Sequence, residues 1–243
     1  NLVINLMPPE LMLPVARLCL EKKVHLIHPA YMDEETRSLN GKCQDLGLVF
    51  ITELGLDPGI DHMSAASSIG GIHASGGRVV SYSSYCGALP AADANTNPWG
   101  YKLSWSPSSL IGASKRTARI IKDNEEIHWP DGMTYEHAEL YEVPTLGFFE
   151  IYANGDSTPY RDFYGIPEAK DVYRGTIRYP GWCETICYMN SLGFFEEGKQ
   201  DAKGMTFAEF TSRQSGGSGS RAKETLCEAL HLKPWSTFIL RME

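Results

Sequence analysis

Strands and helices alternate in the first fifty residues, and this alternation constrains the fold more than any other feature of the chain. Short apolar runs typical of buried strands occupy residues 2–6, 24–27 and 48–52. Between them, residues 11–20 and 33–46 carry apolar side chains at helical spacing. Strands that alternate with single helices are joined by right-handed βαβ crossovers. The sequence therefore predicts a parallel sheet.

This opening resembles the second half of a Rossmann-type domain. A complete domain of that type begins with a strand, a G-x-G-x-x-G turn and a helix, and an acidic residue follows about twenty positions later. No G-x-G-x-x-G occurs in the 243 residues, and Asn1 directly precedes a buried strand. We therefore expect a fragment, a truncated gene product or part of a longer chain. An intact mass near 27.0 kDa would exclude additional flanks.

After Leu54 the pattern of expected elements changes from alternating strands and helices to a mixed α+β order. We therefore expect a domain boundary there. Residues 1–54 form the partial Rossmann-like parallel sheet, and residues 55–243 form a mixed α+β domain, so the fold class is α/β. Strands are expected at 78–86, 125–129, 148–152 and 172–179, and helices at 108–121 and 182–192, the second ending at Gly193. The Gly/Ser stretch 215–220 predicts a flexible loop or, alternatively, an engineered linker.

Charge and composition exclude several classes of protein. The formal net charge is −8 and no basic stripe is visible, which argues against a nucleic-acid partner. The apolar runs are too short to span a bilayer, so no membrane partner is expected. The six cysteines form no C-x-x-C pair and the seven histidines form no metal-binding spacing. Free thiols in a reducing compartment, and no metal site, are the expectation.

The stretch E-L-G-L-D-P-G-I-D-H, residues 53–62, reads as a tight turn between a strand and a helix. In open α/β sheets, ligands bind at the carboxyl ends of strands, where such turns lie. Pro58 presets φ, and Gly59 allows a close approach of the backbone. The turn is suited to present Asp57 to a ligand, although an ordinary βα loop explains the local pattern equally well.

Five motifs in order make the chain resemble the glutamate-forming saccharopine dehydrogenase family of lysine metabolism. They are E-L-G-L-D-P-G-I-D-H, S-Y-C-G-A-L-P, N-P-W-G-Y-K-L-S-W-S, D-S-T-P-Y and R-G-T-I-R-Y-P-G. Family members read very nearly S-Y-C-G-G-L-P, N-P-L-G-Y-K-F-S-W-S and R-G-T-L-R-Y. The resemblance runs from about Leu2 to about Gly193.

The resemblance implies an oxidoreductase that acts on a CH–NH bond with NAD or NADP. It would interconvert saccharopine with glutamate and 2-aminoadipate 6-semialdehyde. The second domain would bind this small-molecule substrate and form a homodimer. The expected location is cytoplasmic, with the mitochondrial matrix as the alternative. A non-catalytic homologue or dimerisation module, and a reductase for a different amine and keto acid, remain open as other functions.

The family pattern also implies roles for individual residues, each with a simpler alternative. Asp57 is the expected catalytic residue, beside the substrate amine, where a carboxylate stabilises charge or relays a proton. The simpler alternative for Cys86 is a thiol packed at a strand end. For Lys102 and Arg178 it is a solvated charge at a strand end. Arg174 is either a further anion ligand or part of a surface ion pair. The expected substrate-binding residues are Ala30, Tyr31, Cys86, Lys102, Thr176 and Arg178. The expected cofactor-binding residues are Leu6, Met7, Pro8, Pro29, Ala30, Leu56, Asp57, Pro58 and Ser106.

One position departs from the family in a way that affects substrate binding. Family members usually read N-R-D-S-T, with the arginine placed to bind a substrate carboxylate. In this chain Gly155 stands in place of that arginine, within N-G-D-S-T. Either another cation such as Arg161 compensates, or the substrate differs, or the protein is inactive.

Overall fold

The computed structural model describes residues 1–196, 198 and 201–243. Over these residues the chain divides into two compact units. The first unit comprises residues 1–80 and 162–168, and the second comprises residues 81–161 and 169–243. No helix in the described part of the chain combines the length and apolar character that crossing a bilayer requires.

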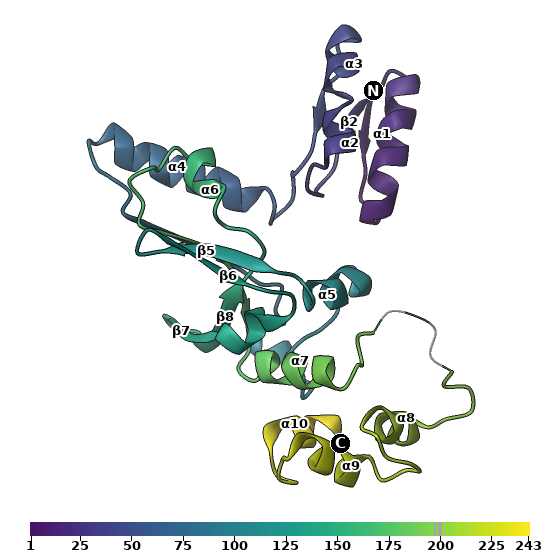
Figure 1. Ribbon diagram of the computed structural model, residues 1–243. Coiled ribbons are helices and arrows are strands. Elements are labelled where there is room, and N and C mark those ends of the chain that lie inside the picture. The colour runs from purple at the N-terminus through teal and green to yellow at the C-terminus, as the bar shows by residue number, and fades with distance from the viewer. Residues whose placement is uncertain (197, 199–200) are drawn as a thin grey trace. The chain divides into compact units, whose positions relative to one another are not determined.

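Within the described residues, the first unit contains a three-stranded parallel sheet in the order β1-β2-β3. Its strands are β1 (Leu2–Ile4), β2 (His25–Ile27) and β3 (Phe50–Ile51), and its first helices are η1 (Pro9–Leu11), α1 (Met12–Glu21), α2 (Glu34–Arg37) and α3 (Asn40–Asp45). Figure 1 shows β2 with the helices α1, α2 and α3 around it. Ala16 and Cys19 of α1 pack with Leu26 of β2 and Cys43 of α3 in a buried cluster. The predicted parallel sheet with intervening helices is confirmed.

The helix expected over residues 33–46 is divided in two. Asp33 caps α2 by accepting a hydrogen bond from the backbone N–H of Thr36 at 2.6 Å. The hydroxyl of Ser38 donates to the carbonyl of Glu35 at 2.6 Å where α2 ends. A serine that binds a nearby carbonyl competes with the regular helix pattern, which explains the interruption.

The longest helix of the first unit, α4 (Ile60–Ala74), is contacted by the segment 162–168. Nδ1 of His62 lies 2.6 Å from the hydroxyl of Tyr164, and Nε2 of His73 lies 3.2 Å from a carboxylate oxygen of Glu168. The same carboxylate accepts a hydrogen bond from the backbone N–H of Val79. Backbone hydrogen bonds are the main reason that the pKa of Glu168 is lowered. A segment distant in sequence is therefore attached at both ends of α4.

The second unit is built on a mixed sheet of six strands among the described residues. The order is β6-β5-β9-β8-β7, with β4 parallel to β9 and the other pairs antiparallel. The strands are β4 (Ser81–Cys86), β5 (Ala118–Lys122), β6 (Glu125–Trp129), β7 (Glu139–Val143), β8 (Gly147–Ala153) and β9 (Asp171–Arg178). The helices are η2 (Ala92–Ala94), α5 (Pro107–Ala113), η3 (Met133–His137), α7 (Trp182–Ser191), α8 (Phe207–Gln214), α9 (Ala222–Leu230) and α10 (Thr237–Met242). The short helix α6 (Tyr160–Phe163) has its first two residues in this unit and its last two in the first unit.

The expected helix over residues 108–121 is wrong in its second half. Helix α5 ends at Ala113, and β5 begins at Ala118. The β-branched residues Ile120 and Ile121 are buried in the sheet, where Ile121 pairs with Val172 of β9. Branched side chains of this kind suit a pleated, buried surface, and tertiary pairing overrides the local helical spacing.

The C-terminal helices of the second unit share one buried cluster. Leu226 of α9 packs with Phe238 and Ile239 of α10, and all three are almost fully buried. Arg241 attaches α10 to the start of α7, because its guanidinium donates to the Pro180 carbonyl at 2.9 Å, to the hydroxyl of Thr185 at 2.7 Å and to the carbonyl of Gly181. The stretch 215–220 forms the connection between α8 and α9. Gly193 follows α7 with φ +74°, as its predicted position at the helix end requires.

Candidate active site

The turn after β3 has a backbone conformation that only its glycines allow. The N–H of Gly55 donates to the carbonyl of Pro58, and the N–H of Ile60 donates to the carbonyl of Gly55, both at 2.9 Å. Gly59 has φ +146°, and a Cβ added there would lie 2.2 Å from the carbonyl oxygen of Gly55. The peptide bond between Asp57 and Pro58 is cis. These contacts form a compact loop with Asp57 on it.

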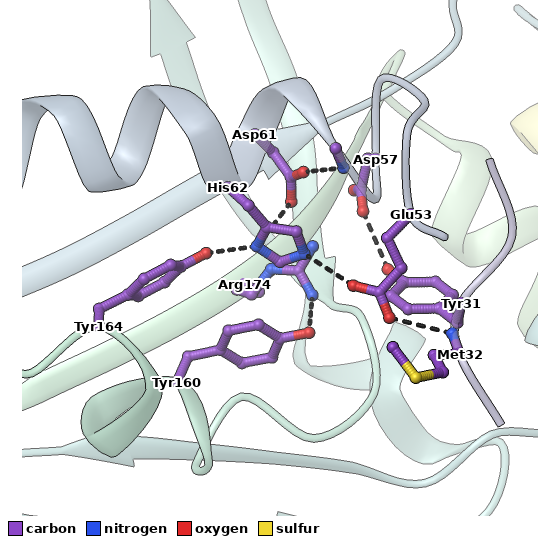
Figure 2. Close-up of polar contacts among 10 residues, drawn as sticks. Tyr31, Met32, Glu53, Asp57, Asp61, His62, Tyr160, Tyr164 and Arg174 are labelled. Atoms are coloured by element: carbon purple, nitrogen blue, oxygen red, sulfur yellow. Dashed lines mark hydrogen bonds and ion pairs between the residues drawn. The ribbon is translucent and has the colours of Figure 1, made fainter. Parts of the chain in front are cut away.

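Tyr31 and Asp57, which the sequence analysis placed at the site, are in direct contact. The hydroxyl of Tyr31 donates to Oδ1 of Asp57 at 2.9 Å. Figure 2 shows the two side chains facing each other. Tyr31 follows β2 and Asp57 follows β3, so the two side chains come from the loops after neighbouring parallel strands. A phenol that donates to a carboxylate fixes its orientation. The carboxyl edge of the sheet thus carries an oriented carboxylate.

Glu53 holds the loop that carries Tyr31. Its backbone N–H donates to the Ala30 carbonyl at 3.1 Å, and its carboxylate accepts from the backbone N–H of Met32 at 3.0 Å. The same carboxylate lies 3.9 Å from Nε2 of His62 (Figure 2). Glu53 and His62 are the first and last residues of the motif E-L-G-L-D-P-G-I-D-H, but the local sequence gives neither of them a role. No local pattern indicates Tyr164, the partner of His62, because it lies about a hundred residues away.

The expected cofactor residues of the first unit gather at the same edge of the sheet. Leu6, Met7 and Pro8 follow β1, and Leu6 and Met7 are exposed. The loop 29–31 follows β2, and the turn 56–58 follows β3, with Leu56 exposed. In a parallel sheet the carboxyl ends of the strands share one edge. The structure therefore brings together Leu6, Met7, Pro8, Pro29, Ala30, Tyr31, Leu56, Asp57 and Pro58 at this edge.

The candidates of the second unit lie on β4 and β9 and in the loop before α5. Cys86 pairs in register with the buried Thr176. Lys102 is exposed. Ser106 caps α5, because its hydroxyl accepts a hydrogen bond from the N–H of Ser109. This capping of α5 is a structural role for Ser106, and it accounts for the presence of a serine before Pro107.

Arg178 and Arg174 are both buried, so the alternatives of a solvated charge for Arg178 and a surface ion pair for Arg174 do not apply. Each is only 5% exposed. The guanidinium of Arg178 lies over the rings of Tyr101 and Trp182, at 5.1 and 5.6 Å from their centroids. The guanidinium of Arg174 donates to the hydroxyl of Tyr160 at 2.8 Å. Aromatic faces stabilise a guanidinium that is removed from water.

A cavity of about 410 Å³ runs along α4. His62 and Tyr164 line one part of it, and His73 lines another. Most of its wall is apolar, with Met63, Ile69 and Phe163 among the lining residues. The described residues contain no cluster of three or more histidines, cysteines or carboxylates that could hold a metal ion.

His28 gives the first unit a stability that depends on pH. Its side chain is 1% exposed, and burial lowers its pKa below the ordinary 6.5, although Asp33, the backbone of Ala30 and Glu53 oppose this shift. Below pH 6.5 the unfolded chain binds a proton that the folded chain resists, so stability should fall between about pH 7 and pH 5. Urea unfolding at both pH values should show a smaller loss for His28→Gln than for wild type. The exposed His231, changed to Gln, is the control; an unchanged pH dependence in His28→Gln would contradict the prediction.

Family models match nearly the whole chain. Residues 55–238 match the saccharopine dehydrogenase C-terminal domain, and residues 1–51 match the saccharopine dehydrogenase NADP binding domain. The chain is 39% identical over 199 residues to the alpha-aminoadipic semialdehyde synthase of Arabidopsis thaliana, which covers 81% of this chain and 19% of that protein. It is 35% identical over 243 residues to the mitochondrial alpha-aminoadipic semialdehyde synthase of Bos taurus, covering 96% of this chain and 26% of that protein.

A solved structure agrees with the fold over the whole chain. It is the apo saccharopine dehydrogenase (L-Glu forming) of Saccharomyces cerevisiae, with a TM-score of 0.85 at 30% sequence identity. The likeness covers 99% of this chain and 56% of that one. The chain therefore spans about half the length, or less, of these relatives.

Proposed function

The chain belongs to the saccharopine dehydrogenase family, and from that premise we propose that it takes part in the NAD(P)-dependent interconversion of saccharopine with glutamate and 2-aminoadipate 6-semialdehyde. The observation that carries the proposal is the Tyr31–Asp57 hydrogen bond at the carboxyl edge of a parallel sheet. That edge is where open α/β sheets bind nucleotides and substrates. The alternatives are a non-catalytic homologue or dimerisation module, and a reductase for a different amine and keto acid.

The residues at this edge fit a nicotinamide. Leu6, Met7 and Leu56 present exposed apolar side chains there, and such side chains suit the face of a flat ring. We assign Leu6, Met7, Pro8, Pro29, Ala30, Leu56, Asp57 and Pro58 of this edge to cofactor binding. Ser106 of the second unit, whose hydroxyl caps α5, is assigned to the cofactor on the family resemblance alone. A bound nicotinamide supplies the hydride acceptor, so the protein itself must orient the substrate and manage protons. The proposal includes NAD and NADP as alternatives, and the match to an NADP-binding domain supports the second.

Asp57 is the proposed catalytic residue. In the oxidative direction, the carbon next to the secondary amine of saccharopine loses a hydride and an imine forms; water then adds, and the C–N bond breaks to give an amine and an aldehyde. A carboxylate beside the amine can take its proton so that the hydride can leave, stabilise the charge that develops on the imine nitrogen, and relay protons during hydrolysis. The phenol of Tyr31 would keep Asp57 Oδ1 oriented during these steps.

Substrate carboxylates need cations and hydrogen-bond donors. We propose that Lys102, Thr176 and Arg178 provide them, with Cys86, Ala30 and Tyr31 in contact with the rest of the substrate. The buried guanidinium of Arg178 supports this role, because a charge held out of water binds an anion more strongly than an exposed charge does.

The proposed organisation follows the sequence analysis. Residues 1–54 would be the C-terminal half of a Rossmann-type domain, and residues 55–243 the substrate and dimerisation domain. The separate family matches to residues 1–51 and 55–238 support this division. We also propose that the protein forms a homodimer through the second domain. Its proposed location is the cytoplasm or the mitochondrial matrix.

The test is saccharopine-dependent formation of reduced nicotinamide, followed at 340 nm, with the protein expressed from its complete gene. We expect absorbance to rise only when saccharopine and NAD or NADP are both present. Separate assays with the two nucleotides identify the preferred one. If calorimetry detected no binding of either nucleotide to that protein, the enzyme proposal would fail and the non-catalytic alternative would stand.

Gly155 favours the alternative of a different substrate, and a substitution tests it. Gly155 has φ +71°, and a Cβ added there meets nothing within 4 Å, so space for a side chain exists. If a saccharopine carboxylate binds near residue 155, Gly155→Arg should lower KM for saccharopine about tenfold or more, since a charge-assisted hydrogen bond contributes about 1.5–3 kcal/mol. Gly155→Ala is the matched control, because it carries the same backbone strain without the cation. Equal KM values for the two variants would indicate that another cation compensates or that the substrate is different.

A further inference from the structure

Glu53 has a backbone conformation that is costly for its residue type. Its φ is +56°, in the left-handed region where glycine and asparagine are favoured. A glutamate at such a position costs about 1 kcal/mol or more in backbone strain. Strain of this kind is found at functional sites, where the surrounding contacts maintain it. We therefore expect the contacts of the Glu53 side chain to maintain this strained conformation.

The contacts of Glu53 bracket Tyr31 from both sides. Its N–H donates to the carbonyl of Ala30, the residue before Tyr31, at 3.1 Å. Its carboxylate Oε1 accepts from the N–H of Met32, the residue after Tyr31, at 3.0 Å. Between these two bonds, the side chain of Tyr31 reaches Asp57 (Figure 2). One residue thus fixes the backbone on each side of the tyrosine.

His62 supports the other oxygen of the same carboxylate. Nε2 of His62 lies 3.9 Å from Oε2 of Glu53, and the two side chains are 15% and 30% exposed. On the other side of the ring, Nδ1 lies 2.6 Å from the hydroxyl of Tyr164. Nδ1 also lies 3.8 Å from Oδ2 of Asp61. In the tautomer in which Nδ1 accepts from the phenol, the neutral ring carries its proton on Nε2, the nitrogen nearer Glu53. The order of contacts is Tyr164, His62, Glu53, the Tyr31 loop and Asp57.

We propose that Glu53 is a positioning residue that holds Tyr31 against Asp57, and that His62, oriented by Tyr164, keeps the Glu53 carboxylate in place. This inference rests on the proposed function, because the network matters for catalysis only if Asp57 is the catalytic residue. Neither Glu53 nor His62 needs to touch the substrate for this role. A displacement of about 1 Å in a reacting group can lower a rate about a hundredfold, so a positioning residue has a measurable effect.

Two substitutions at residue 53 separate the side chain from the backbone. Glu53→Gly relieves the left-handed strain and removes the carboxylate, so the variant should fold. Glu53→Gln keeps an oxygen that can accept from the N–H of Met32. In the protein expressed from its complete gene, we expect kcat for saccharopine oxidation to fall about ten- to a hundredfold in Glu53→Gly and to be largely restored in Glu53→Gln. The loss in kcat should exceed any change in KM for the nucleotide, because both variants keep the backbone N–H of residue 53 that donates to the Ala30 carbonyl.

A double-variant cycle shows whether Glu53 acts through Tyr31. If it does, adding Glu53→Gly to Tyr31→Phe should lower kcat much less than Glu53→Gly does alone. A merely structural role predicts that the two losses multiply. His62→Gln should reproduce part of the Glu53→Gly loss, again only while Tyr31 is present. Full kcat in Glu53→Gly, or multiplying losses in the double variant, would overturn the proposal.

A readout without saccharopine separates this inference from the proposed function. Amide hydrogen exchange of the peptide that contains Met32 should be faster in Glu53→Gly than in wild type and near the wild-type rate in Glu53→Gln. If wild type did not oxidise saccharopine while exchange changed in this way, the substrate assignment would fail and the loop contact would stand. If exchange were the same in all three proteins, the positioning role would fail whatever the activity.

Discussion

Changing Asp57 to asparagine should lower kcat for saccharopine oxidation by about 10²- to 10⁴-fold, the usual contribution of a positioned acid or base. The variant keeps the shape of the side chain and an oxygen that can accept from the Tyr31 hydroxyl. It removes the negative charge and the ability to take a proton. Steady-state rates at saturating saccharopine and nucleotide, with the protein expressed from its complete gene, measure the effect.

Asp61 is the matched control, because it belongs to the same turn and contacts the backbone of Gly59 and, at 3.8 Å, Nδ1 of His62 instead of Tyr31. Its Oδ1 accepts a hydrogen bond from the backbone N–H of Gly59 at 2.7 Å. The amide oxygen of Asp61→Asn can accept that bond as well, so kcat should change by no more than about threefold. A kcat for Asp57→Asn as high as that for Asp61→Asn would show that the proton is handled by another group.

Local pattern predicted the first unit well because its strands and helices follow one another in space as they do in sequence. Each crossover from β1 to β2 and from β2 to β3 is short and contains its own helices. The apolar periodicity of these segments is produced by packing against their immediate neighbours. The break between α2 and α3 depends on one serine hydroxyl that binds a nearby carbonyl, which periodicity does not reveal.

The second unit depends on contacts between distant residues, and there local pattern was less informative. Ile120 and Ile121 have spacing compatible with a helix, but they are buried in the strand pairs that β5 makes with β6 and β9. Strand β7 was not expected, since its residues are mostly exposed and no alternating apolar pattern marks it. The burial of Arg178 depends on Tyr101 and on Trp182 of α7. None of these pairings has a signal within one segment.

Two residues that the family pattern implied lie in direct contact, whereas contacts with residues outside the motifs could not be predicted. Asp57 and Tyr31 were expected at the site, and the structure shows the hydrogen bond between them. Glu53 and His62 are part of the same motif, but their roles depend on Met32 and Tyr164. Hydrogen bonds to distant residues carry no signature in a single sequence.

Changing Gly59 to alanine should reduce the free energy of unfolding of the first unit by about 3 kcal/mol or more. A loss of this size is expected because the new side chain would collide with backbone atoms in a conformation that favours glycine. The new Cβ would lie 2.2 Å from the oxygen and 2.6 Å from the nitrogen of Gly55. Both are backbone atoms, and they take part in the bonds to Pro58 and Ile60 that close the turn. Relief of the clash therefore requires those bonds to break. Urea unfolding followed by far-UV circular dichroism measures the loss.

Gly76→Ala separates this clash from backbone strain alone. Gly76 follows α4 with φ +79°, so alanine there also enters a left-handed conformation, but its Cβ would meet nothing within 4 Å. That variant should lose only about 1 kcal/mol, the cost of the conformation without a steric conflict. Because Gly59 lies two residues from Asp57, kcat for saccharopine should fall in Gly59→Ala even at temperatures where the protein stays folded. Equal stability losses for the two variants would show that the turn can open without breaking its hydrogen bonds.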